Sequence, residues 1–369
     1  MLTGVLLIQA TIILFANYQL FPWFIQTNFH PVSQCIQNCL KKLAYQLDYP
    51  LDSPWVPGYA RMPKTSCRSF GEWLRKQCSF ASNSSYLDYS ISDLLNLIDG
   101  YQDYLQPESR YLINCGAQDG RTNDPLYQTF IKYKYPGIAI ELQEGFYAKL
   151  KENLPASNIA KVNQALEPHT VQHIFRANAV PQRPLLFKID IDGYDYPVVR
   201  ALFLHPLNNC RTEFEPAFVM VEMNEKVPPP INFYTRYRVP YAYAGDHLYG
   251  ASITAWTRLL SYEFGYVLLG TYDWNNLMYI RYDLAQHFKL LYQFPHNSHD
   301  VWFHGYWNRP ERDEKFPWNK NVTYWSDSNT TLLTKNRNIE NYLRSTRTFT
   351  ENINCSYFID VESLYLEQR

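Results

Sequence analysis

The chain has 369 residues, with 34 lysine and arginine residues against 35 aspartate and glutamate residues, and its formal net charge is −1. No long basic run occurs, which excludes the clustered positive charge that nonspecific nucleic-acid binding requires, so we expect no nucleic-acid partner. The length suits one large α/β domain with additions, or two domains.

The amino terminus is apolar, and no charged residue precedes Lys41. We interpret residues 1–25 as a hydrophobic signal or anchor segment and expect the protein at a membrane or in the secretory pathway (ER or Golgi) rather than in the cytoplasm. Three forms stay open: a signal peptide cleaved near Ala16, an uncleaved anchor, or a buried helix. The lysine pair that begins at Lys41 favours a cytosolic carboxyl terminus, which leaves the orientation open as well.

Residues 26–107 form an extension that contains cysteines and short helical patterns, the last of which runs from Ile91 to Asp99 and ends at Gly100. Four of its cysteines can form two disulfides in an oxidising compartment or stay reduced, and the sequence leaves their pairing open. These four are Cys35, Cys39, Cys67 and Cys78.

From about residue 108 to 290, short apolar strands alternate with helical patterns, which predicts parallel βαβ units. The expected strands are Tyr111–Asn114, Gly137–Leu142, Ile159–Asn163, Pro184–Asp190 and Ala217–Met223. The clearest helical patterns are Phe146–Asn153, Pro197–Phe203 and Ser252–Phe264.

Two final strands, Tyr266–Thr271 and Leu277–Tyr282, are joined by a turn instead of a helix, so one strand of the sheet is expected to be antiparallel. The predicted fold is therefore α/β and Rossmann-like: a mostly parallel sheet with helices on both faces, one antiparallel strand near an edge, and extensions at both termini. Residues 291–369 are aromatic and polar without this alternation, and we interpret them as an appended cover and not as a second catalytic domain.

Four groups of residues follow expected strands, where open α/β sheets bind their ligands. The first strand leads into Asn114-Cys115-Gly116-Ala117-Gln118-Asp119-Gly120, whose glycines allow a close backbone approach to a ligand. The second strand ends at Glu141, a spacing at which a carboxylate can accept hydrogen bonds from both hydroxyls of a ribose. A solvated carboxylate at a strand end is the alternative interpretation of Glu141.

The other two groups are acidic. The expected strand Pro184–Asp190 leads into three acidic residues around one glycine: Asp190, Asp192 and Asp195. The next strand leads into Glu222 and Asn224. Neighbouring carboxylates can hold a hard divalent cation or act as a general base with a raised pKa. A solvated turn is the alternative for the first group, and a salt bridge is the alternative for Glu222.

Taken together, N-x-G-A-x-x-G, a glutamate ending the next strand, F-K-I-D-I-D-G-Y-D and V-E-M-N resemble the FkbM-type S-adenosylmethionine-dependent methyltransferases over about residues 108–285. The chain departs from that family's pattern at Asn114, where the family has an acidic residue, and at Asp192 and Asp195, where it has glutamates. The resemblance implies a methyltransferase domain over residues 108–290. The cofactor-binding residues that it implies are Asn114, Gly116, Ala117, Gly120, Glu141 and Asn163.

The leading hypothesis is an O-methyltransferase that uses S-adenosylmethionine and acts on a hydroxyl of a glycan or small metabolite, because methyl transfer needs an aligned acceptor oxygen and a group that takes its proton. Asp190 or Asp192 is the first candidate for the base, or for a ligand of a divalent cation. Glu222 and Asn224 are supporting candidates, and His247 is a second candidate base whose alternative role is structural.

Two other classes of protein compete with this hypothesis. A Golgi-type glycosyltransferase would use Asp190-Ile191-Asp192 to bind a metal. A non-catalytic cofactor-binding fold is the second rival, and the uncharged Asn114 keeps it open. The identity of the acceptor and the oligomeric state do not follow from the sequence.

Overall fold

The computed structural model describes residues 88–89, 96, 98–100, 109–122, 124–204, 211–237, 248–287, 298–321, several positions between 331 and 341, and residues 357–360. Within them, Leu51–Pro206 and Thr212–Arg369 belong to one compact unit. Three predictions concern residues outside the described ones. They are the signal or anchor segment at residues 1–25, the disulfides of the four cysteines in the extension, and the candidate base His247.

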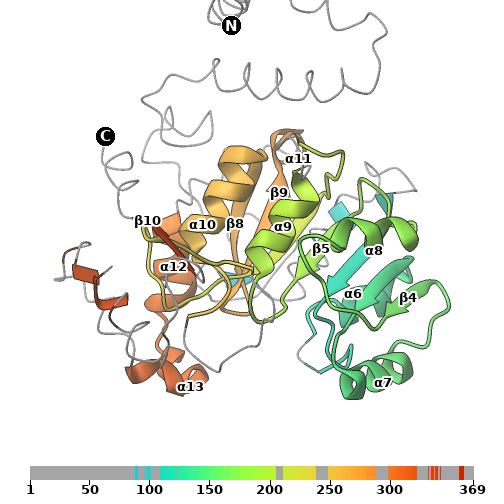
Figure 1. The fold of residues 1–369 in the computed structure, drawn as a ribbon, viewed down its shortest axis with the longest axis horizontal. Coiled ribbons are helices and arrows are strands. Elements are labelled where there is room, and N and C mark those ends of the chain that lie inside the picture. The colour runs from blue at the N-terminus through green and yellow to red at the C-terminus, as the bar shows by residue number, and fades with distance from the viewer. Residues whose placement is uncertain are drawn as a thin grey trace, which may run out of the picture. The chain divides into compact units, whose positions relative to one another are not determined.

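The unit is built on an eight-stranded sheet in the order β1-β8-β9-β6-β5-β2-β3-β4 (Figure 1). All neighbouring strands are parallel except where β9 pairs with β6 and β8. This confirms the expected mostly parallel sheet with one antiparallel strand. The strands are β1 Asp88–Tyr89, β2 Leu112–Cys115, β3 Gly137–Ile140, β4 Ile159–Val162, β5 Leu186–Ile189, β6 Phe218–Glu222, β8 Tyr266–Tyr272 and β9 Asn276–Arg281.

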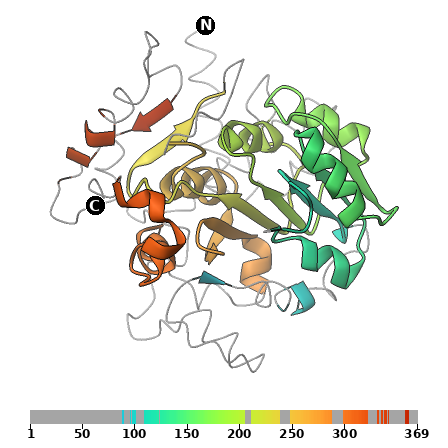
Figure 2. The same cartoon turned by 90° about the horizontal axis from the view of Figure 1, so that it is seen from below.

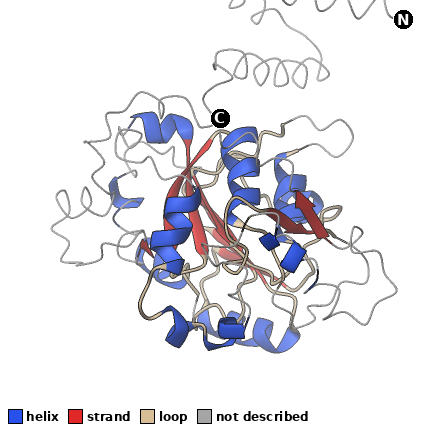
Figure 3. Cartoon of the chain, turned by 90° about the vertical axis from the view of Figure 1, so that its left-hand side faces the viewer, coloured by secondary structure: helices blue, strands red, loops and turns tan. Residues whose placement is uncertain are grey.

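Helices lie on both sides of the sheet (Figure 3). They are α6 Tyr127–Tyr133, α7 Glu144–Asn153, α8 Val171–Ala177, α9 Asp195–Phe203, α10 Ile253–Thr257 with a π-helical continuation Arg258–Glu263, and α11 Tyr282–His287. Alternate residues of each central strand enter two separate apolar cores, as the two-residue period of a strand requires. Ile113 and Phe187 face the core under α8, α9 and α10. Leu112 and Leu186 face the core under α6 and α7.

Position 114 in β2 and position 188 in β5 therefore face α6 and α7, and both carry polar side chains, Asn114 and Lys188, that are buried. The two residues are register partners on adjacent parallel strands. A buried lysine is uncommon unless it has a charged partner, so this pair marks a local departure from an apolar core.

Two segments outside the expected α/β domain join the unit. Strand β1, from the extension before residue 108, pairs in parallel with β8 at one edge of the sheet. A second sheet pairs β7 Asn232–Thr235 with β10 Tyr357–Asp360. Among the described residues, no helix is long and apolar enough to cross a bilayer.

The segment 298–321 contains α12 Ser298–Trp302, a π-helical turn Phe303–Trp307, α13 Arg312–Lys315 and a 3-10 turn Pro317–Asn321. Trp302 and Tyr306 are buried in the core that also holds α9 and α10. In both views this segment (orange) lies on the opposite side of the unit from α7 and β4 (green) (Figures 1 and 2). Segment 298–321 is therefore packed into the unit through these buried side chains.

Candidate functional site

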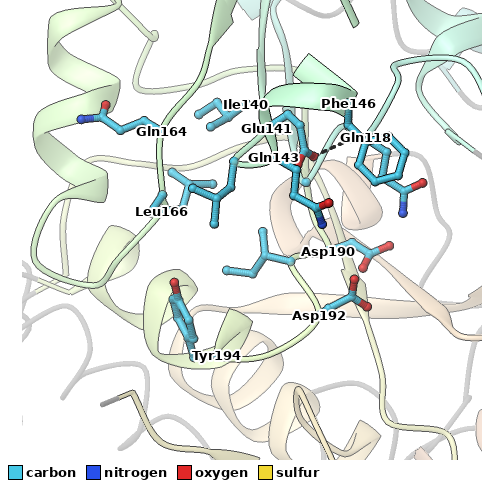
Figure 4. A pocket seen from close by; sticks show the side chains of 14 residues that line it. Gln118, Ile140, Glu141, Gln143, Phe146, Gln164, Leu166, Asp190, Asp192 and Tyr194 are labelled. Atoms are coloured by element: carbon cyan, nitrogen blue, oxygen red, sulfur yellow. Dashed lines mark hydrogen bonds between the residues drawn. The ribbon is translucent and has the colours of Figure 1, made fainter. Parts of the chain in front are cut away.

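The carboxyl ends of β2, β3 and β5 surround a cavity of about 370 Å³ (Figure 4). It brings Gly116, Glu141, Asp190 and Asp192 together from three different strand ends. The lining residues are Gly116, Gln118, Ile140, Glu141, Leu142, Gln143, Phe146, Gln164, Ala165, Leu166, Asp190, Ile191, Asp192 and Tyr194.

The turn after β2 requires glycine at Gly116. Its φ of +72° lies in the left-handed region, and a Cβ there would collide with the backbone carbonyl of Asp190. The amides of Gly116 and Ala117 both donate to the carbonyl of Ile140 at 3.0 Å. The turn is thus held between β3 and the end of β5, and its backbone forms one wall of the cavity.

Glu141 is a buried carboxylate whose two oxygens each accept a backbone N–H. Oε2 accepts from Gln118 at 2.8 Å and Oε1 accepts from Gln143 at 2.7 Å. Each oxygen keeps further acceptor capacity, because an ionised carboxylate offers about four lone-pair sites. The side chain is therefore fixed in place and can still accept two hydrogen bonds from a ligand diol.

Four other predicted cofactor-binding residues are not among the residues that line the cavity. Ala117 is buried in the core beside α7, and a Cβ on Gly120, which also has a positive φ, would collide with Leu150 of that helix. Asn163 donates to the carbonyls of Glu141 and Leu142 at 2.8 and 2.9 Å. The fourth, Asn114, is described below with its partner. In the structure these residues lie behind the cavity lining and hold the lining segments in place.

Several side chains that line the cavity belong to none of the motifs found in the sequence. Leu142 is 61% exposed and Phe146 36% exposed, and both follow Glu141 closely. Gln143, Gln164 and Leu166 complete this side, and Gln118 and Tyr194 lie nearby. Position was the available signal, because each of these residues lies within six residues after the end of a strand. An exposed apolar residue beside a strand-end carboxylate is suited to packing on an aromatic ring.

Asp190, Asp192 and Glu222 form a group of carboxylates, each offering one oxygen within 4.8 Å of the others. Partial burial and Asp190 raise the pKa of Asp192, against the lowering effect of Lys188. Burial, followed by the charges of Asp190 and Asp192, raises the pKa of Glu222 well above its usual range. Asp190 instead lies 3.6 Å from the Lys188 ammonium. Oxygen donors in this number suit a hard divalent cation, and a proton is the other way to relieve their repulsion.

The turn that carries Asp192 is constrained by its own chain. Asp192 has a φ of +53°, a conformation that aspartate tolerates better than most residues. Asp195, the first residue of α9, accepts the amides of Ile191 at 2.8 Å and Gly193 at 3.1 Å. Burial raises the pKa of Asp195 to about 7, which its two backbone hydrogen bonds partly oppose. Asp195 therefore stabilises the turn through these hydrogen bonds, and Asp192 lines the cavity.

Beyond Glu222 the edge of the sheet is filled by a network that we call the Glu225 network: Glu222, Glu225, Lys226, Tyr249, Trp302, Tyr306 and Asn319. The Lys226 ammonium lies 2.8 Å from Glu225, and the two side chains are 2% and 1% exposed. Asn319 donates to Glu225 Oε1 and to the Tyr306 hydroxyl at 2.9 Å, and Trp302 Nε1 donates to the Glu225 carbonyl at 2.8 Å. This network bonds segment 298–321 to the end of β6.

Tyr249 joins Glu222 to that network, because its hydroxyl lies 3.3 Å from both Glu222 Oε1 and Glu225 Oε2. Glu222 Oε1 also accepts from Asn275 at 2.9 Å, and Oε2 is buried with no hydrogen-bond partner among the described residues. The predicted site residue Asn224 donates to the Tyr249 carbonyl at 2.9 Å and accepts the Lys226 amide at 3.1 Å. Asn224 therefore braces the loop and does not line the cavity.

The sequence also predicts that Tyr234, Tyr237, Tyr241 and Tyr243 line an acceptor cleft, and the structure describes the first two of them. Tyr237 donates to Glu167 at 2.7 Å, and its ring lies edge-on to Tyr194 with centroids 4.9 Å apart. Tyr234 stacks on Tyr196 with centroids 4.1 Å apart. Tyr234 and Tyr237 are not among the residues that line the cavity, whereas Tyr194, beside Tyr237, is.

The strand order β4-β3-β2-β5-β6-β9-β8, with β9 antiparallel, is a Rossmann-like α/β arrangement. No family model and no curated protein matches the chain. Eight of the solved structures that are similar to it have 8–14% sequence identity with the chain and TM-scores of 0.23–0.33.

Three of these structures illustrate the likeness. One is the CMeT domain of the citrinin polyketide synthase, with 12% identity, a TM-score of 0.33 and 52% of each chain covered, so the chain spans about half of that neighbour. The second is an O-methyltransferase family protein from Burkholderia thailandensis, with 11% identity, a TM-score of 0.29 and coverage of 66% and 71%. The third is an S-adenosylmethionine-dependent methyltransferase from Clostridium acetobutylicum, with 8% identity, a TM-score of 0.29 and coverage of 57% and 96%. At these TM-scores the likeness supports no conclusion about activity, which must be argued from the site.

Proposed function

We propose that the protein is an S-adenosylmethionine-dependent O-methyltransferase. The observation that carries the proposal is that Gly116 and Glu141 line the same cavity, one giving close backbone approach and the other two aligned acceptor oxygens. The cavity has a carboxylate at Glu141, apolar side chains at Leu142 and Phe146, and exposed backbone at the Gly116 turn. These suit, in turn, the ribose diol, the aromatic base and the charged amino-acid end of the cofactor. The FkbM-type resemblance agrees with this assignment and stays a prediction.

In this proposal Glu141 accepts hydrogen bonds from the two ribose hydroxyls, and Leu142 and Phe146 pack against the adenine. The backbone of the Gly116 turn faces the methionine part. Bound S-adenosylmethionine supplies an activated methyl group, and the chain has to align an acceptor oxygen with it and take the acceptor's proton.

Asp192 is our choice for the group that takes this proton. It lines the cavity, and its raised pKa makes it a stronger base than an ordinary aspartate. Asp190 is less suited because its Oδ2 already lies 3.6 Å from the Lys188 ammonium. Glu222 lies behind both and does not line the cavity.

The same ion pair argues against the glycosyltransferase alternative. A metal-binding Asp-x-Asp needs both carboxylates for the cation, whereas Lys188 already lies 3.6 Å from Asp190. A nucleotide-sugar site also has no particular need of the Gly116 turn beside Glu141. The acceptor class, a hydroxyl of a glycan or a small metabolite, belongs to the proposal.

Calorimetry tests the proposal. The expected result is binding of S-adenosylmethionine at one site, and no binding of a nucleotide sugar with manganese. The opposite pattern would identify the glycosyltransferase alternative, and binding of neither would identify an inert fold. Turnover measured with and without a chelator then separates a base from a cation: with Asp192 as the base, the chelator leaves the rate unchanged.

A further inference from the structure

Lys188 is not among the residues that line the cavity, but it contacts two that are, Gly116 and Asp190. Its side chain is 4% exposed. The ammonium donates to the carbonyl of Gly116 at 3.0 Å, in the turn after β2, and lies 3.6 Å from Asp190 Oδ2, at the end of β5. One buried cation thus connects the two strand ends between which the proposed cofactor would sit.

A buried ammonium needs negative charge nearby, because the loss of hydration is otherwise not offset. Burial lowers the pKa of Lys188, but Asp190 and then Asp124 raise it, and the pKa is raised on balance. Asp190 lines the cavity and faces any ligand there. Asp124 does not line the cavity, so its effect on Lys188 does not depend on a ligand there. Burial raises the pKa of Asp124 itself, and the charge of Lys188 opposes that rise.

Asp124 is held in place by two further contacts. Its Oδ1 accepts the amide of Leu126 at 2.9 Å, just before α6. Its Oδ2 accepts from the side-chain amide of Asn114 at 2.8 Å. Asn114 is fully buried and is the register partner of Lys188 on the neighbouring strand. Asn114 therefore orients a carboxylate that arrives from the turn ten residues further along the chain.

We propose that Lys188 is a positioning residue of the cavity and that Asp124, oriented by Asn114, supplies its counter-charge in place of an acidic residue at position 114. The inference rests on the proposed function, since it explains how a strand without an acidic residue at 114 still forms a complete cofactor site. Asn114 then no longer supports an inert fold.

An exchange of the acid and the amide tests this assignment. Asp124→Asn removes the counter-charge, and Asn114→Asp places a second carboxylate against Asp124. Each single variant is expected to weaken S-adenosylmethionine binding by about tenfold, the scale of one charge-assisted hydrogen bond. The double variant Asn114→Asp/Asp124→Asn restores one acid and one amide, and its affinity is expected to return to within about threefold of the unaltered protein. Asp313→Asn, in an exposed ion pair of α13, is the control and leaves binding unchanged.

Thermal unfolding of the same proteins is the second measurement, and the exchange should restore the midpoint that each single variant lowers. If singles lose stability but keep full affinity, Lys188 is merely structural and the proposal is overturned. A double variant no better than the singles in either measurement also overturns it. If no protein binds S-adenosylmethionine but the midpoints follow the exchange, the charge arrangement stands and the proposed function fails.

Discussion

The two halves of the sheet's carboxyl edge use similar residues in opposite ways. At the ends of β2, β3 and β5, acidic side chains and a glycine turn surround a cavity. At the end of β6, Glu225 and Lys226 are almost fully buried and bond to each other and to segment 298–321. Charge at a strand end therefore does not define a site: it can bind a ligand only where the chain leaves space beside it.

Glu222 lies at the boundary between these halves. One oxygen is held by Asn275 and Tyr249, and the side chain approaches Asp190 and Asp192 within 4.8 Å. The comparison therefore predicts that changes in the cavity half act on cofactor binding and turnover, and that changes in the Glu225 network act first on stability.

The largest effect is expected from Gly116→Ala, which should abolish detectable S-adenosylmethionine binding in calorimetry. The new Cβ would collide with the carbonyl of Asp190, and the φ of +72° is unfavourable for alanine. Gly145→Ala is the matched control, because a Cβ at Gly145 meets nothing within 4 Å, and binding should not change.

Gly120→Ala separates lost binding from lost folding. It has a similar positive φ, but its Cβ would collide with Leu150, away from the cavity. We expect Gly120→Ala to lower the unfolding midpoint and, where folded, to bind the cofactor. Normal binding by Gly116→Ala would contradict the cavity assignment.

Asp192→Asn comes next. We expect it to lower turnover by about 100-fold or more and to leave cofactor binding nearly intact, as for the loss of a general base or metal ligand. Single-turnover rates and calorimetry are the measurements. Asp273→Asn, at an exposed turn, serves as the control. Normal turnover would show that Asp192 is only a residue of the turn. Loss of cofactor binding would show that it contacts the cofactor.

Glu141→Ala should weaken S-adenosylmethionine binding by about 2–3 kcal/mol, the cost expected for losing hydrogen bonds to a charged group. The exposed neighbour Glu144, at the start of α7, provides the matched variant Glu144→Ala, for which we expect unchanged affinity. Calorimetry on both proteins makes the comparison. Equal affinities in two folded variants would remove Glu141 from the site.

The smallest effect is expected in the other half. Tyr249→Phe removes a hydroxyl that lies 3.3 Å from both Glu222 and Glu225 and should lower the free energy of unfolding by about 1–2 kcal/mol. Urea unfolding measures this loss, and cofactor affinity should stay as it is. A strong loss of affinity with unchanged stability would show that the two halves do not act separately.

The sequence predicted the central strands because their apolar runs are continuous, as expected for strands buried on both faces. It also identified Gly116, Glu141 and Asp192, which follow three of those strands and line one cavity. It missed α6 and α8, seven-residue helices, and the pairing of β7 with β10, whose partners lie over 100 residues apart. Short elements that depend on distant partners leave no periodic pattern in the sequence.

The contacts that hold the site residues in place could not be predicted from the sequence either, because their partners lie far away in the chain. Asn114 seemed to weaken the site because it lacks a charge. The structure places Asp124 against it, 2.8 Å away, from a turn that has no motif. Similarly, nothing near Glu225 in the sequence indicates Asn319, which is 94 positions away and bonds to it.

A crystal structure with S-adenosylhomocysteine tests the central claim most directly, that the cavity half of the edge is a nucleoside cofactor site. The account predicts the ribose hydroxyls within hydrogen-bond distance of the Glu141 carboxylate, the adenine against Leu142 and Phe146, and the sulfur on the side of Asp192. Ligand bound elsewhere on the chain, or a cavity that stays empty at saturating concentration, would contradict it.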